Sequence, residues 1–157
     1  MTNSTQSEFH VPPLSLSTSL ICFSALGQDI AVEKNKIVAM LKIGSDDVIV
    51  CHGRARGLVT SYCGDIIPVV DCRQSGAASY AGSSAMVAKV LGKKFMLLID
   101  RVSGSVEFSY LECIEMCDTR DDSAGGLIGR IWKNGQSIYV VDLDLMMGPV
   151  IKQLMLT

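Results

Sequence analysis

The sequence predicts a mainly β protein made of two small barrel-like subdomains, on the basis of its composition, its short strand-like segments and an internal repeat. Hydrophobic residues make up 48% of the 157 residues and charged residues 19%, a balance typical of folded domains. Val and Ile crowd the middle of the chain, and Gly and Ser interrupt them, as expected for short strands joined by turns. Similar strand patterns recur at offsets of 65 to 71 residues, which indicates a duplication.

The first residues differ in composition from the rest. Residues 1–19 are rich in Ser and Thr, contain Pro12 and Pro13 and show neither helical nor strand periodicity, so we expect a flexible N-terminal tail. They lack the basic start and apolar core of a secretory signal, and no stretch approaches the roughly 20 apolar residues of a membrane helix. We therefore expect a cytoplasmic protein without direct membrane insertion, whose folded domain spans residues 20–157.

The folded part begins with a strand, a turn and a strand. Residues 20–25 and 30–32 suit strands, and the Leu-Gly-Gln-Asp link at 26–29 has the residue types of a hairpin turn. Three further features follow in order: an apolar segment at 37–43, a short strand at 48–51 and a basic loop at 52–56.

A second hairpin is predicted in the middle of the chain. Two β-prone segments, 58–62 and 66–72, are joined by Cys-Gly-Asp at 63–65, which contains the Gly and Asp that tight turns require. Pro68 lies inside the second segment, where its missing N–H is tolerated only at an edge, a strand start or a bulge. The sequence therefore predicts a small or strongly bent sheet here.

The second half of the chain repeats the first. The pattern at 26–38 recurs at 91–102, and the pattern at 57–71 recurs at 126–142. Two copies are too few for a solenoid, so we expect each copy to supply the strands of its own barrel, packed against the other. This gives subdomain 1 at about 20–75 and subdomain 2 at about 84–147, separated by a linker of small residues at 74–84.

Near the end of the chain the sequence predicts a loop and only a short helical turn. An acidic loop is expected at 117–123, and residues 143–147 suit a short helical turn that Gly148 and Pro149 would stop. The apolar tail at 150–156 is expected to dock on the body of the protein.

At this point the order of segments resembles the CheW-like domain of bacterial chemotaxis adaptors. Residues 57–73, most strongly Pro-Val-Val-Asp at 68–71, are similar to the signature of that family, and segments 97–102 and 140–144 resemble further family positions. The resemblance runs from about residue 20 to the end and marks a divergent member. It implies two five-stranded SH3-like β-barrels packed side by side, with a groove between them and few short helices.

The resemblance also implies a function and a binding site. Such domains are non-catalytic couplers that bind the regulatory domain of a CheA-type histidine kinase and the cytoplasmic tip of a chemoreceptor. Receptor contacts are implied near the groove, at the positions matching Ile37, Gly57 and Cys63. The family has Arg where this chain has Cys63, and a thiol offers one weak donor where Arg offers five. The resemblance therefore implies a receptor contact that this chain cannot make in the same way.

Two alternatives to receptor coupling stay open. Cys63, with His52, Arg54 and Arg56 upstream, is either a small turn residue or the reactive thiol of a redox sensor or enzyme. In the second alternative, the chain is a self-associating CheW-like paralogue that does not bind a receptor and forms a homo-oligomer.

Other functional classes find no support in the sequence. It contains no Gly-rich phosphate loop, nucleophile elbow or paired carboxylates with a supporting base, so we expect no catalysis and no cofactor. The net charge of −2 and pI near 5.6 give no basic footprint for nucleic acid. Cys113 and Cys117 lack a second pair at zinc spacing, so no metal site is expected. Cys22 and Cys72 lie in apolar strands and are expected in the core.

Three more residues attract attention. Asp71 and Asp142 end equivalent strands of the two copies, and we expect both to accept hydrogen bonds from turn N–H groups. Trp132 lies beside a predicted hairpin turn, where it suits either a binding surface or the core.

Overall fold

The computed structural model describes residues 17–47, 49–52, 57–74, 79–109, 115–116, 126–133 and 135–156. As predicted, strands dominate. The elements in chain order are β1 (Ser17–Ala25), β2 (Gln28–Glu33), the 3₁₀ turn η1 (Lys34–Lys36), β3 (Ile37–Lys42), β4 (Ile49–His52), β5 (Gly57–Tyr62), β6 (Asp65–Asp71), β7 (Ser84–Val90), β8 (Lys93–Ile99), β9 (Arg101–Ser109), β10 (Glu115–Met116), β11 (Leu127–Lys133), β12 (Gln136–Val141) and the helix α2 (Leu143–Leu156).

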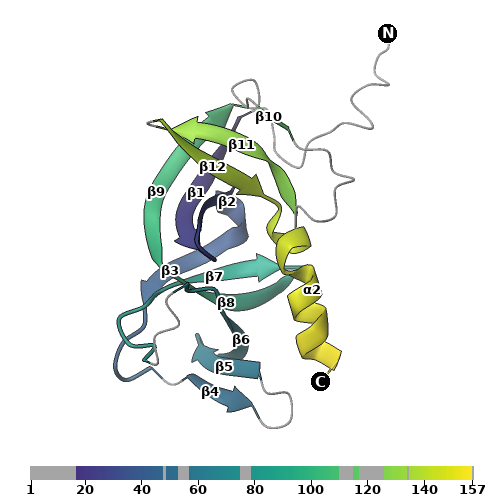
Figure 1. Ribbon diagram of the computed structural model, residues 1–157. Helices are drawn as coiled ribbons and strands as arrows, with labels where there is room; N and C mark the ends of the chain where they lie inside the picture. Colours follow the sequence, from purple (N-terminus) through teal and green to yellow (C-terminus); the bar gives the residue numbers. More distant parts are fainter. Residues whose placement is uncertain are drawn as a thin grey trace.

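Two curved sheets form two subdomains, with α2 alongside them (Figure 1). The first sheet has the order β10-β11-β12-β2-β1-β9, and the second has the order β3-β7-β8-β6-β5-β4. The resemblance implied five strands in each barrel, whereas hydrogen bonds link six strands in each sheet. One of these strands, β10, is only two residues long. The mainly β, two-subdomain architecture is as predicted.

The sheets cross the boundary expected between residues 75 and 84. The β1–β2 hairpin of the first copy pairs with β9 and β12 of the second, and the β7–β8 hairpin of the second pairs with β3 and β6 of the first. The expectation that each copy builds its own barrel is therefore wrong. A repeat in the sequence shows which strands are alike, but a hairpin has two free edges, and sequence similarity does not say which copy covers them.

The hydrogen-bond register supports the duplication itself. Val69 pairs in parallel with Met96, and Val140 pairs in parallel with Ala31, so the two exchanged hairpins meet equivalent valines. The ladder between β1 and β9 shifts register next to Cys22, and the ladder between β3 and β7 shifts at the equivalent place. The two halves are thus related by reciprocal pairing.

The same register corrects one detail of the repeat. The strand pattern matches Gly57 with Gly126, but Leu58 and Gly129 are the residues that pair with the two equivalent valines. An irregularity between Leu127 and Gly129 accounts for one residue of this two-residue displacement, because an extra residue in a strand shifts every earlier position.

The core has three layers because the central strands bury both faces. Along β1, Leu20 and Cys22 pack inside the first sheet, whereas Ile21 and Phe23 pack into the layer between the sheets. We call this second set the central layer. Its buried members are Ile21, Phe23, Ala25, Ile30, Val32, Cys72, Met86, Ala88, Val90, Phe95, Leu97, Ile99, Val141, Leu143 and Met147. Strands buried on two faces read as continuous apolar runs, and this explains the composition of β1 and β8.

Pro68 lies within β6 although this strand has a neighbour on each side. It sits opposite Val59 of β5, while the pairing of β6 with β8 begins only at Val69. The missing N–H therefore falls where the second ladder has not started, as the rule for prolines in strands requires.

The two ends of the domain differ from expectation. β1 begins at Ser17, three residues before the predicted start at Leu20. At the other end, α2 continues through Gly148 and Pro149 to Leu156, so the predicted stop is wrong. Pro149 is exposed, and its ring costs the helix one backbone hydrogen bond. Met147, two residues before it, is buried in the central layer.

No helix in the described residues combines the length and the apolarity needed to cross a membrane.

Candidate partner-binding surface

Ile37 begins β3, at one edge of the second sheet. Its side chain is half-buried and packs against the central layer, and its backbone pairs with Ala88 of β7. Within the described residues β3 pairs with β7 alone, so its other edge has no partner strand there. Ile37 thus connects the surface at this edge to the packing between the subdomains.

The exposed apolar groups on β3 are its neighbours rather than Ile37 itself. Val38 is 41% exposed and Met40 48% exposed, while Ala39 and Leu41 pack against the core inside the second sheet. This surface could not be predicted from the sequence, because all the residues from 37 to 41 are apolar and period-2 alternation is then invisible.

Cys63 occupies the first position of the two-residue turn between β5 and β6. Its φ is +50° and that of Gly64 is +87°, and Tyr62 pairs with Asp65 across the turn. Two positive φ angles in a two-residue loop define the type I′ turn, which matches the twist of the flanking strands. The predicted hairpin is confirmed, and the Cys63 side chain is exposed at its tip.

The three predicted receptor positions do not form one neighbourhood by strand pairing. Gly57 and Cys63 flank β5 at opposite ends, separated by six residue steps or about 20 Å. Ile37 lies on β3, and β7, β8 and β6 stand between β3 and β5 in the sheet. Strand pairing alone therefore does not bring the three residues together.

The register also bears on thiol activation at Cys63. The backbone of His52 pairs with Gly57, at the far end of β5, so His52 does not lie beside Cys63 as the redox hypothesis requires. Arg54 and Arg56 lie outside the described residues.

Cys22 and Cys72 are buried, as predicted. Burial raises the pKa of the Cys22 thiol, and burial with the nearby Asp71 raises the pKa of Cys72 to about 11. Both thiols are protonated at neutral pH and serve as small core residues.

Arg73 bonds to Ser79 and Ser83, which lie in the described part of the segment expected as a linker. Its Nε and Nη2 donate to the two carboxylate oxygens of Asp71 at 2.9 and 2.8 Å. Nη1 donates to the Ser79 carbonyl and the Ser83 hydroxyl, both at 3.0 Å, and the guanidinium carbon lies 5.1 Å from the centre of the Tyr80 ring. Hydrogen bonding from Arg73 holds the pKa of Asp71 below its usual range. We call these contacts the Arg73 latch.

Beside the latch, backbone bonds join the two subdomains. The Leu26 N–H donates to the Cys72 carbonyl at 2.9 Å, and the Asp100 N–H donates to the Ser24 carbonyl at 2.9 Å. The Gln74 N–H donates to the Asp100 carboxylate at 3.1 Å. The exchanged β1–β2 hairpin is therefore tied at its tip to the end of β6.

Asp71 and Asp142 perform the role expected of them. The Asp71 carboxylate accepts the Arg73 N–H at 3.1 Å, and the Asp142 carboxylate accepts the Leu145 N–H at 3.2 Å. Asp142 is thereby the N-cap of α2, because it satisfies an N–H that has no partner within the helix.

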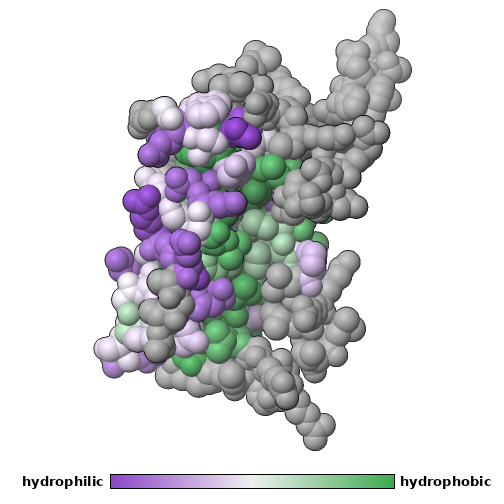
Figure 2. All heavy atoms as spheres, viewed as in Figure 1, coloured by the Kyte–Doolittle hydropathy of each residue, from purple (hydrophilic) through white to green (hydrophobic). Residues whose placement is uncertain are grey.

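Apolar atoms gather on one face of the molecule. Figure 2 shows hydrophobic residues running along the length of the face seen in Figure 1, with hydrophilic residues along their left side. Trp132 on β11 is 49% exposed, so a place in the core is excluded. Among the residues with described placement, no three His, Cys, Asp or Glu side chains cluster as metal ligands would. Cys113, Cys117 and the acidic loop lie outside that part of the chain.

Comparison with known proteins bears on the fold. No protein-family model matches this sequence, and no curated protein matches it. Among solved structures, the scaffolding protein TtCheW from Thermoanaerobacter tengcongensis is similar, with a TM-score of 0.62 over 83% of this chain and 92% of that chain. The fold is CheW-like. Sequence identity between the two is 18%, so the CheW-like likeness concerns architecture and not the individual residues of a site.

Proposed function

We propose that this chain is a non-catalytic adaptor in chemotaxis-type signal transduction, which couples a chemoreceptor to a CheA-type histidine kinase in the cytoplasm. The observation that carries the proposal is the CheW-like fold, which extends over both subdomains and is similar to a scaffolding protein over 92% of that protein's length. The exposed apolar residues on β3 and α2 support binding as the mode of action, because exposed apolar surface favours partner contacts.

The kinase contact is the first part to test. The chain should co-elute with the regulatory domain of a CheA-type kinase from the same genome when both are mixed at about 10 to 50 µM, the range in which a micromolar complex is mostly formed. Separate elution at these concentrations would refute the adaptor proposal.

The receptor contact is expected to be weak in the wild type, because a thiol replaces the guanidinium that the family places at Cys63. Cys63→Arg should strengthen binding to a receptor-tip fragment by about tenfold, the gain typical of one charge-assisted hydrogen bond. Leu26→Arg is the matched control, since Leu26 is also exposed with positive φ in a two-residue turn. Equal gains in both variants would mean that added charge, rather than position, causes the effect.

Thiol chemistry at Cys63 is the less favoured alternative, because His52 lies at the far end of β5. The adaptor proposal expects Cys63→Ser to leave kinase binding unchanged. Two results together would favour the redox alternative: loss of kinase binding in Cys63→Ser, and rapid alkylation of Cys63 in the wild type below pH 7.

Self-association has one specific observation in its favour. Val38 and Met40 are exposed on β3, an edge strand in the described sheet, and such edges pair with other chains. If the chain is a homo-oligomer through this edge, Met40→Lys should yield monomers in sedimentation velocity, with Trp132→Lys as the matched exposed control. A wild type that sediments as a monomer would exclude this alternative.

A further inference from the structure

A small polar pocket opens at one end of the first sheet. Its volume is about 170 Å³, and its lining residues come from five strands: Cys22, Asp29, Arg101, Ser103, Lys133, Gln136 and Ile138. We propose that this pocket binds a carboxylate group, supplied either by a small monocarboxylate or by an acidic side chain of a partner protein. No part of the proposed adaptor function assigns a role to these residues.

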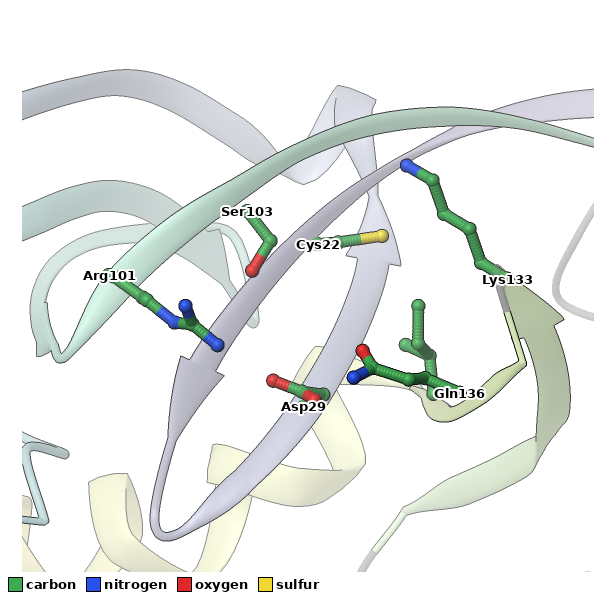
Figure 3. A pocket seen from close by; sticks show the side chains of 7 residues that line it. Cys22, Asp29, Arg101, Ser103, Lys133 and Gln136 are labelled. Carbon is green, nitrogen blue, oxygen red and sulfur yellow. The ribbon is translucent and has the colours of Figure 1, made fainter.

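The pocket exists because the first sheet curls strongly. Arg101 lies on β9 and Lys133 ends β11, and three strands separate β9 from β11 in the sheet order. Both side chains nevertheless line the same pocket, and Figure 3 shows them entering it from opposite sides. Cys22 and Ile138 are buried and form apolar wall, so a bound group would be partly withdrawn from water.

The charged groups leave donors available for an anion. Arg101 donates through Nε to the Ser24 hydroxyl at 3.2 Å, and no other bond of its guanidinium is made to the residues the structure describes. Lys133 makes no ion pair within the same residues. The terminal guanidinium nitrogens and an ammonium group thus face one space, the combination that binds carboxylates and phosphates.

Asp29 selects between those two anions. Its Oδ1 accepts a hydrogen bond from Ser24 at 2.7 Å, and no described cation lies within ion-pair distance of its carboxylate. With Arg101 and Lys133 the pocket carries a net charge of about +1, which suits a carboxylate and disfavours a phosphate dianion through repulsion by Asp29. Its volume is below the roughly 300 Å³ of pockets for drug-sized ligands, so the free ligand would have only a few heavy atoms.

The other half of the molecule offers an internal comparison. The hydrogen-bond register places Val38 at the position of Ser103, each being the extra residue at a register shift. It likewise places Tyr62 at the position of Lys133, each being the last strand residue before a two-residue turn. At these two positions the polar lining is a property of one copy and does not follow from the shared fold.

Titration of ¹⁵N-labelled protein with sodium acetate, at constant ionic strength set with sodium chloride, tests the proposal. We expect the amide resonances of Ser103 and Gln136 to shift with a Kd in about the millimolar range, as a ligand of four heavy atoms allows. Arg101→Gln and Lys133→Gln should each weaken binding by about tenfold, the effect of losing one charge-assisted contact. Lys93→Gln removes the same charge from an exposed residue outside the pocket and should leave binding unchanged.

Further titrations distinguish a small monocarboxylate from a partner's acidic side chain, and a carboxylate from phosphate. A capped Gly-Glu-Gly peptide that binds as well as acetate would identify a partner's side chain as the source, and acetate binding alone would identify a small molecule. Asp29→Asn should allow inorganic phosphate to bind. Absence of pocket shifts, equal weakening in Lys93→Gln, or tighter binding of phosphate than acetate to the wild type would each overturn the proposal.

Discussion

The two copies of the repeat share their strand pairing but end in different ways. In the first copy β6 ends at Asp71, whose carboxylate pairs with Arg73, and Arg73 also bonds to Ser79 and Ser83. In the second copy β12 leads to Asp142, whose carboxylate caps α2. The same residue type in equivalent positions thus starts a latched loop in one half and a helix in the other. The repeated sheet fixes the architecture, and the residues after each aspartate give each half its own surface.

The largest effect is expected where α2 leaves the second copy. Gly126 has a φ of +84°, and a Cβ added there would lie 2.8 Å from the backbone nitrogen of Met146. Gly126→Ala should lower the free energy of unfolding by at least about 3 kcal/mol, because backbone strain and a clash with the helix add together.

Gly92→Ala is the matched control for that variant. Gly92 has a φ of +80° but no atom within 4 Å of an added Cβ, so about 1 kcal/mol of strain is expected alone. Urea denaturation measures both variants. Equal losses would show that α2 does not pack closely on Gly126 and would contradict the described start of the helix.

The next largest effect on stability is expected from replacing Asp71 by Asn, and the same replacement at Asp142 serves as the comparison. Asp71→Asn removes the charge that pairs with Arg73, whose side chain is only 5% exposed, and should cost about 2 kcal/mol. Asp142→Asn should change stability by less than about 0.5 kcal/mol, because Asn caps helices as well as Asp. Thermal or urea unfolding of both variants gives the comparison, and a larger loss at Asp142 would reverse the roles assigned to the two residues.

The Arg73 latch also predicts a pH dependence. Because the folded pKa of Asp71 is lowered, its contribution to stability is present at neutral pH and is lost as the pH falls below the ordinary Asp pKa of about 3.9. Between about pH 6 and pH 3, Asp71→Asn should therefore lose less of its unfolding free energy than the wild type does. Parallel loss in both proteins would mean that Asp71 does not titrate at a lowered pKa.

The smallest effect concerns the turn at Cys63. Asn is favoured at the first position of type I′ turns, so Cys63→Asn should raise the free energy of unfolding by about 0.5 to 1 kcal/mol. Cys63→Val should lower it, since a β-branched side chain strongly disfavours positive φ. Chemical denaturation of the three proteins decides whether Cys63 is a strained turn residue.

Local features of the fold could be predicted from the sequence because they depend on nearby residues. The Cys63–Gly64 turn, the strand around Pro68 and the role of Asp142 all follow from backbone chemistry within a few positions. Exchange of the hairpins could not be predicted, because the pairing of Val69 with Met96 joins different copies and two-sided apolar strands fit either partner. The stop expected at Pro149 was wrong, since a proline costs a helix one backbone hydrogen bond and α2 continues in spite of it.

The site was harder to predict than the fold. Ile37, Gly57 and Cys63 come from family resemblance, and they stay predictions, although their places on β3 and around β5 are now defined. Arg73 drew no attention in the sequence because its partners Ser79 and Ser83 lie in a segment of small residues that looks like a linker. The polar pocket was missed because its residues are spread from position 22 to position 138.

Kinase activity in a reconstituted complex tests the central claim most directly. Autophosphorylation of a CheA-type kinase would be measured with a receptor-tip fragment, in the presence and absence of this chain. The account predicts that the chain raises the rate only when receptor and kinase are both present, and that Cys63→Arg raises it further. An unchanged rate, with neither the kinase nor the receptor retaining the chain, would contradict the proposal that this CheW-like protein is a coupling adaptor.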